Sequence, residues 1–317
     1  MAGYILRRVL WLAPVLFFIS LITFALMHSV EGGPWDNGER ALPAPVAENL
    51  NREYGLDQPI WRQYADFAWN ALHGDLGVSY QRQNRPVTAI ILSGFKVTAV
   101  LGLSAFALAA AGGITLGLAA AVNRGGVADY AGVALATAGA SVPGFVLGIF
   151  LVYGFSVKLH ALPTFGWDLN HGILLGLLPR PQQMVMPVIA LAALPLAYLA
   201  RITRASMLEV LEQDYLRTAR AKGLASSVVI YRHALRNALV PVVTVMGPMI
   251  AGLVTGSFII EQLFSIPGTG RLFIQSVEAR DYGMIMGATL FYAAAIAVAN
   301  LAVDVAYAFV DPRIRYG

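Results

Sequence analysis

The densest group of ionisable side chains lies in one internal segment, EQDYLRTARAKGL at 212–224, followed by RHALRNALVP at 232–241. Arginines and a lysine alternate here with acidic and small residues, so the available chemistry is ion pairing and close surface contact. No nucleophile, base and metal ligands occur together at a spacing that would support catalysis. Composition leaves two interpretations open: a surface for a protein partner, or an interfacial helix whose basic face meets anionic lipid.

Helical spacing predicts that residues 205–223 form one helix across this segment. Its apolar stripe consists of Leu208, Leu211, Tyr215 and Ala219. Asp214 and Arg217 are three residues apart and can pair on the neighbouring face. Gly223 is well placed to end the helix, because glycine adopts the left-handed conformation that follows many helix C-termini. The segment is therefore expected to be a rigid polar element between two apolar spans.

Apolar segments of membrane-spanning length dominate the rest of the sequence. Of 317 residues, 57% are hydrophobic and 13% are charged, whereas soluble domains average about 25% charged residues. A helix needs about 20 apolar residues to cross a bilayer. Six segments are of this order: 9–30, 97–122, 130–157, 184–200, 238–260 and 282–303. The sequence predicts an all-α polytopic membrane protein with about six transmembrane helices, the fourth kinked at Pro187 and Pro195.

The distribution of arginine and lysine predicts the orientation. Positive residues favour cytoplasmic segments, and they cluster before the first span, in 201–236 and after the last span. Residues 31–85 instead contain five arginines and eight acidic residues. Both termini and segment 212–224 are therefore predicted to lie inside. The outer region 31–96 is expected to form a small cap with helices near 45–54 and 59–72.

Other classes of protein fit the composition less well. The first apolar run follows Arg7 and Arg8 like a signal peptide, but it is longer than a signal core and no Ala-x-Ala site follows. We therefore expect residues 1–30 to be an uncleaved anchor. The absence of cysteine excludes disulfides and thiolate metal sites. The histidines lack the spacing of a metal site, and the net charge of +4 sits beside apolar spans, which argues against nucleic-acid binding.

The segment DYLRTARAKGL at 214–224, with HALRNALVP at 233–241, resembles the EAA-type coupling segment of permease subunits of binding-protein-dependent ABC importers. The general consensus has Glu-Ala-Ala where this chain has Arg217, Thr218 and Ala219, a variant typical of the peptide/nickel branch. More narrowly, the chain resembles the first permease of that branch. Further matching stretches are GLDQP at 55–59, GDLGVS at 74–79, PGTGR at 267–271, RDY at 280–282, NLAVD at 300–304 and DPRIRY at 311–316.

This resemblance implies a type I importer permease fold in the cell inner membrane. It implies a second homologous permease, two ATPase subunits and an extracytoplasmic solute-binding protein as partners. ATP and Mg²⁺ would bind the ATPases, and this chain would bind no cofactor. The core would be 97–310, with a coupling helix at about 212–224 and a cytoplasmic tail at 311–317. The coupling residues implied are Glu212, Asp214, Tyr215, Arg217, Thr218, Ala219, Lys222, Gly223 and Leu224.

Two further groups of residues carry expectations. The loop after the fifth span and the cap are expected to dock the binding protein; the candidates are Glu261, Phe264, Pro267, Arg271 and Asp281. Asn300 and Asp304 lie towards the inner end of the last span. Asp304 is expected to have a structural partner such as Arg201 or Arg204, since an acid in a span needs a partner.

The resemblance implies a non-enzymatic subunit that imports di- or oligopeptides, while nickel chelates and glutathione remain alternative cargoes. An ion-coupled secondary transporter is an alternative from another class. Such transporters normally place titratable groups near midmembrane, and the second, third and fifth spans contain none. A membrane-embedded enzyme lacks the necessary cluster of catalytic side chains.

Overall fold

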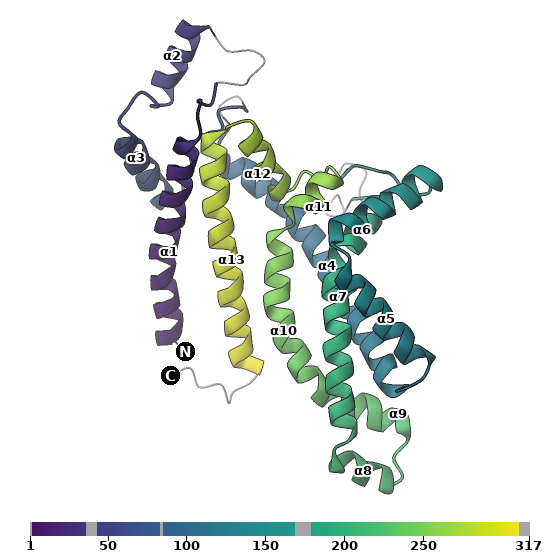
Figure 1. The fold of residues 1–317 in the computed structure, drawn as a ribbon. Coiled ribbons are helices and arrows are strands. Elements are labelled where there is room, and N and C mark those ends of the chain that lie inside the picture. Colours follow the sequence, from purple (N-terminus) through teal and green to yellow (C-terminus); the bar gives the residue numbers. More distant parts are fainter. Residues whose placement is uncertain (1, 36–42, 83–84, 169–178, 311–317) are drawn as a thin grey trace. The chain divides into compact units, whose positions relative to one another are not determined.

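The computed structural model describes residues 2–35, 43–82, 85–168 and 179–310 (Figure 1). In these ranges the secondary structure is helical apart from an antiparallel bridge between Val78 and Pro86. The elements are α1 (Ala2–Ser29), α2 (Ala44–Glu53), α3 (Ile60–Leu72), α4 (Val87–Val122), α5 (Val127–Ser141), α6 (Gly144–Leu151), η1 (Val152–Lys158), α7 (Pro181–Leu211), α8 (Asp214–Ala221), α9 (Ser226–Val228), η2 (Val229–Ala234), α10 (Leu235–Thr255), α11 (Phe258–Leu263), α12 (Thr269–Glu278) and α13 (Tyr282–Val310). The predicted tail 311–317 lies outside the described residues.

The described part of the chain has five helices long and apolar enough to cross a membrane, and a sixth span if a bent pair is counted as one. The prediction of about six spans is confirmed in this sense. The third span is not the single helix predicted for 130–157, because α5 and the helix formed by α6 and η1 meet at 102°. Pro143 cannot continue the hydrogen bonding of α5, and Val142 before it is extended, with φ −96° and ψ 121°.

Several helices extend beyond the apolar windows. The helix predicted to begin at 97 begins at Val87, and α7 continues through Leu211 with Pro187 and Pro195 inside it. The fifth span begins at Ser226 as α9 and η2, ahead of the predicted residue 238. The additional turns of α7 and of the fifth span are polar, and hydropathy marks only the lipid-spanning part of a helix. The cap helices α2 and α3 lie where the sequence predicts them.

The chain divides into two compact units. Unit 1 comprises residues 1–98, 267–302 and 312–317, and unit 2 comprises residues 99–266 and 303–311. Within unit 1, α3 packs on α1, where the Tyr64 hydroxyl lies 2.9 Å from Ser20 Oγ and its ring lies 5.3 Å from that of Phe24. The same unit joins α4 to α12, because Thr98 Oγ1 accepts a 2.9 Å hydrogen bond from the backbone N–H of Thr269.

The carboxylate of Asp281 is the polar centre of unit 1. It accepts hydrogen bonds from the Ser79 hydroxyl, the Tyr80 amide at 3.1 Å and the Gln81 amide at 3.4 Å. It also caps α13 by accepting from the amide of Met284 at 3.2 Å. Burial, and then the Asp281 charge, raises the pKa of Tyr80 to about 12. These hydrogen bonds hold the turn at 79–81, which precedes α4, to the start of α13.

In unit 2, small residues let α4 approach α7 closely. A Cβ added to Gly113 would lie 2.6 Å from Leu199 Cβ, and one added to Gly117 would lie 2.5 Å from the carbonyl oxygen of Ala200. No side chain fits at these distances. α5 is held to α7 by an ion pair in which Arg204 donates to Asp129 at 2.6 and 2.9 Å.

The four-donor arrangement predicts that Asp281→Ala destabilises the protein. Each buried donor left without an acceptor costs about 1–3 kcal/mol, so the melting temperature of the purified transporter should fall. Asp281→Asn keeps one acceptor oxygen and should fall less. The matched control is Asp57→Ala, because Asp57 is exposed in the cap of the same unit. Equal melting temperatures for Asp281→Ala and Asp57→Ala would contradict the assignment.

Candidate functional site

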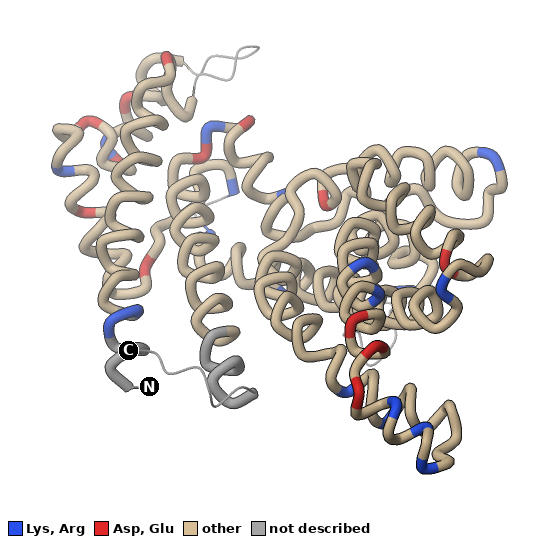
Figure 2. Tube along the Cα trace, turned by 60° about the horizontal axis from the view of Figure 1, so that its bottom comes forward, with Lys and Arg blue, Asp and Glu red and all other residues tan. Residues whose placement is uncertain are grey.

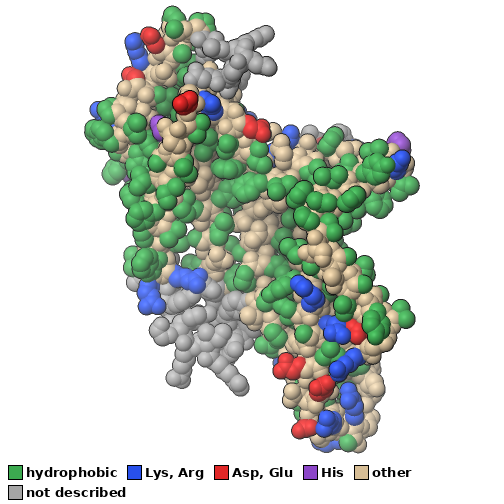
Figure 3. All heavy atoms as spheres, in the orientation of Figure 1, with side chains coloured by type: hydrophobic (Ala, Val, Ile, Leu, Met, Phe, Trp, Pro, Cys, Tyr) green, Lys and Arg blue, Asp and Glu red, His purple; other side chains and the backbone are tan. Residues whose placement is uncertain are grey.

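The polar segment 212–224 forms a separate short helix, α8. The continuous helix predicted for 205–223 is wrong, because α7 ends at Leu211 and Gln213 is extended at φ −71° and ψ 142° before α8 starts at Asp214. Figure 2 shows basic and acidic residues concentrated at α8 and at the adjoining end of α7. Figure 3 shows the same charged side chains on the surface of this part of unit 2.

A buried leucine anchors α8 to its neighbours. Leu216 is fully buried, in a group called here the anchor cluster: Ala121, Met207, Leu216, Val229, Ala234 and Ala238. Ala219 packs against this cluster from the same helix. The predicted stripe is wrong at Tyr215, which is 43% exposed. The break at 212–213 restarts the helix with another face inward, so Leu216 is the buried residue.

Tyr215 instead ties α8 to α10 by a polar contact. Its hydroxyl oxygen accepts a 2.7 Å hydrogen bond from Nδ2 of Asn237. The chain connects α8 directly to the end of α7, while the anchor cluster includes residues of η2 and α10. The short helix therefore has contacts with both membrane-spanning helices that flank it in sequence.

The charged side chains of the segment face outward. Glu212, Asp214, Arg217, Thr218, Lys222 and Leu224 are exposed, while Ala219 is half-buried. Arg124 lies 3.1 Å from Glu212, and Arg217 lies 3.4 Å from Asp214. The second of these pairs was predicted from the spacing. Exposed ion pairs contribute little stability, about 0–1 kcal/mol each, so these charges can change partners at low cost.

A Schellman motif ends α8 at Gly223. The Gly223 amide donates to the carbonyl of Arg220 at 2.9 Å, and the Leu224 amide donates to that of Ala219 at 3.4 Å. Gly223 has φ +79°, the left-handed conformation of this motif. A Cβ at this position would meet nothing within 4 Å. The glycine is therefore required by backbone conformation and not by crowding.

The ion pair beside this site was missed from the sequence. Asp129 also accepts a 3.0 Å hydrogen bond from the Gly125 amide, so its carboxylate fixes both the start of α5 and Arg204 of α7. Arg204 was one of two partners expected for Asp304, and it pairs with Asp129 instead. The side chain of Asp304 lies outside the described residues, and Asn300 is exposed.

The five docking candidates differ in exposure. Asp281, Glu261 and Phe264 are buried within this chain. Pro267 is exposed and Arg271 is half-buried. Glu261 and Phe264 belong to unit 2, whereas the other three belong to unit 1. Among the described residues no group of three or more His, Asp or Glu is placed to hold a metal ion.

Two family models match the sequence. The model described as binding-protein-dependent transport system inner membrane component matches residues 113–316, and the N-terminal model of such membrane components matches residues 1–102. The chain belongs to this family. The predicted membership is therefore confirmed: this is a multi-pass inner-membrane permease component of a binding-protein-dependent transport system, and it is not itself catalytic.

Similar proteins are known along the whole length of this permease. The dipeptide transport system permease protein DppB of Bacillus subtilis (strain 168) is 41% identical over 315 residues, covering 99% of this chain and 98% of that protein. The oligopeptide transport system permease protein OppB of Escherichia coli (strain K12) is 41% identical over 316 residues and covers 100% of both. The solved inward-facing MetNI methionine ABC transporter matches with a TM-score of 0.52 and 16% identity, over 70% of this chain and 96% of that one. This match supports the predicted permease fold.

The conformation of Gly223 predicts an order among substitutions in this permease. A left-handed backbone costs an L-residue about 1–2 kcal/mol, but asparagine tolerates it better than a β-branched residue. Gly223→Val should therefore speed hydrogen exchange of the Gly223 and Leu224 amides more than Gly223→Asn does. Gly154→Val is the control, because a Cβ there also meets nothing within 4 Å and φ is not positive. Equal exchange in the two Gly223 variants would refute the conformational argument.

Proposed function

We propose that this permease is one of two homologous membrane subunits of an ATP-driven importer of di- or oligopeptides, and that α8 couples it to an ATPase. The proposal rests on how α8 is held: Leu216 is fully buried and the helix contacts α7 and α10, while its charged side chains are exposed. Such an element transmits a displacement as a rigid body. A flexible basic loop would absorb it.

ATP hydrolysis is assigned to partner subunits. The sequence contains no Gly-x-x-x-x-Gly-Lys-Ser/Thr phosphate loop, so the proposed complex has two ATPases that bind ATP and Mg²⁺. An extracytoplasmic binding protein would deliver the cargo, in keeping with the binding-protein-dependent family. Both termini and α8 would be cytoplasmic, because the basic residues concentrate there.

The names of the similar proteins support a peptide cargo, since both are permeases of dipeptide or oligopeptide systems and match along the full chain. Nickel chelates and glutathione remain alternative cargoes for the same machinery. A secondary transporter is less well supported, because residues 97–122 and 238–260 contain no acidic, basic or histidine side chain to carry ion coupling.

Reconstitution tests the proposed function directly. Proteoliposomes containing this chain, its second permease, both ATPases and the binding protein should accumulate a labelled dipeptide or tripeptide only with ATP. Omission of the ATPases should abolish uptake. Peptide uptake by this chain alone, driven by a proton or sodium gradient, would reject the ATP-coupled mechanism in favour of a secondary transporter. ATP-driven uptake of a nickel chelate or glutathione, without peptide uptake, would reject only the cargo.

The packing of α8 on the anchor cluster predicts a variant in which ATP hydrolysis is uncoupled from uptake. Ala219→Leu adds bulk where Ala219 packs on the anchor cluster, so α8 should shift while the spans remain inserted. ATP hydrolysis should continue, but peptide uptake per ATP should fall by about tenfold, the effect of a misfit costing about 1–3 kcal/mol. Ala225→Leu is the matched control, since Ala225 is exposed just beyond α8. Normal uptake per ATP in Ala219→Leu would exclude the proposed role of this packing contact in coupling.

A further inference from the structure

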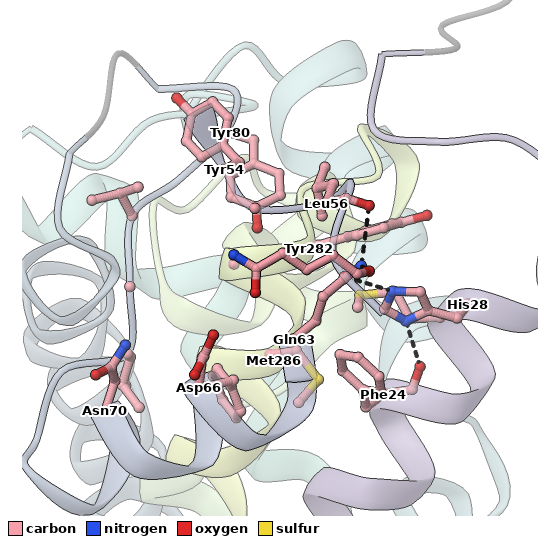
Figure 4. Close-up of a pocket in the computed structure, with 18 of the residues that line it drawn as sticks. Phe24, His28, Tyr54, Leu56, Gln63, Asp66, Asn70, Tyr80, Tyr282 and Met286 are labelled. Atoms are coloured by element: carbon pink, nitrogen blue, oxygen red, sulfur yellow. Dashed lines mark hydrogen bonds between the residues drawn. The ribbon is translucent and has the colours of Figure 1, made fainter. Parts of the chain in front are cut away.

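Unit 1 contains a cavity of about 300 Å³ at the base of the cap. Its walls come from the end of α1, the turn between α2 and α3, the α3 helix, the 76–80 turn and the start of α13. In Figure 4, the rings of Tyr54, Tyr80 and Tyr282 lie across the space from Asp66 and Asn70 of α3. All lining residues belong to this one unit.

Hydrogen bonds fix one wall of this cap cavity. Gln63 donates through Nε2 to the backbone carbonyls of Leu56 at 3.1 Å and Gln58 at 2.8 Å. His28 donates through Nδ1 to the carbonyl of Phe24 at 3.0 Å, and its Nε2 lies 3.4 Å from Oε1 of Gln63 (Figure 4). The wall is therefore held in place before any guest enters.

Three other residues of the cap cavity, Gln58, Asp66 and Glu53, offer acceptor oxygens. Oε1 of Gln58 is buried and receives no hydrogen bond from the described residues. The carboxylates of Asp66 and Glu53 form no hydrogen bond or ion pair with another described residue. The lining includes no lysine or arginine. Asp66 and Glu53 are exposed carboxylates, and the Gln58 oxygen is a buried acceptor, which is costly without a donor; a guest that brings N–H groups and positive charge suits both.

The aromatic wall suits the same guest. Tyr54 and Tyr80 are 4.5 Å apart between ring centroids, and Tyr80 and Tyr282 are 6.4 Å apart. Burial, followed by the nearby carboxylates, raises the pKa of both Tyr54 and Tyr80, which keeps these phenols neutral. Neutral aromatic faces attract an ammonium group. A free carboxylate would meet two like charges and no lysine or arginine, which disfavours the C-terminal end of a peptide cargo.

We propose that the cap cavity receives the side-chain ammonium of a lysine on the solute-binding protein. This assignment rests on the proposed function for the outer position of the cap, where that protein would arrive. Two features favour a protein as the source: residues 31–85 carry more acidic than basic residues, and α3, which contributes Asp66 to the cavity, exposes Trp61 and Trp69. Exposed tryptophans are frequent anchors of protein interfaces.

Stimulation of ATP hydrolysis by the binding protein tests the proposal in the reconstituted complex. Asp66→Asn removes the charge with little change of shape and should raise the half-maximal binding-protein concentration about fivefold, as expected for one ion pair, with unstimulated hydrolysis unchanged. Asp57→Asn is the matched control, because Asp57 is an exposed cap residue that does not line the cavity. Identical values for Asp66→Asn and Asp57→Asn would overturn the proposal.

A small-molecule probe keeps the test valid if Asp66→Asn fails to assemble. n-Butylammonium chloride should compete with the binding protein on the wild-type complex, and butanol at the same concentration should not. Acetylation of the binding protein's lysines should weaken stimulation, whereas dimethylation, which retains the charge, should weaken it less. No competition by butylammonium, or full stimulation by the acetylated protein, would overturn the lysine assignment. Because these measurements read ATPase stimulation, a wrong peptide cargo would leave their result unchanged.

Discussion

The burial of Leu216 is the contact on which α8 and the adjoining ends of its neighbouring helices depend. A helix of eight residues is too short to be stable alone in water, so α8 exists because its neighbours hold it. Leu216 supplies the apolar anchor, and Tyr215 adds a polar contact with Asn237. The remaining faces are left to charged side chains. The burial of Leu216 therefore fixes α8 in place and leaves its charged surface exposed.

In unit 1, the buried carboxylate of Asp281 is the contact on which the local structure depends. It joins two stretches that are far apart in the sequence. GDLGVS at 74–79 supplies the Ser79 hydroxyl and the turn before α4, while RDY at 280–282 supplies the carboxylate that receives it. Gly283 completes the contact, since a Cβ there would lie 2.2 Å from the carbonyl oxygen of Val78. These stretches lie two hundred residues apart in sequence, and each is half of one packing arrangement.

The sequence predicted the spans and the cap helices because the length of an apolar segment and a proline at a helix start are local properties. They failed where a distant contact decides the outcome. Tyr215 and Leu216 are adjacent apolar residues, and only the break at 212–213 selects Leu216 for burial. Asp129 pairs with Arg204, which is 75 positions away in the sequence, and no local sequence pattern indicates a pair at such a separation. Asp281 looked like an exposed loop acid, although its four donors come mostly from the remote 79–81 turn.

The helices that carry α8 contain their own points of bending. Pro187 and Pro195 lie inside α7, Pro241 and Pro248 lie inside α10, and α10 ends at Gly256 with φ +101°. Each proline removes one backbone hydrogen bond from its helix and weakens it locally. The ends of both helices next to α8 are joined to it by packing, and the prolines lie beyond these contacts along each helix. If α8 meets an ATPase as proposed, its displacement would move the adjoining ends of α7 and α10 together and be taken up as bending along these helices, which is the deformation that alternating access requires.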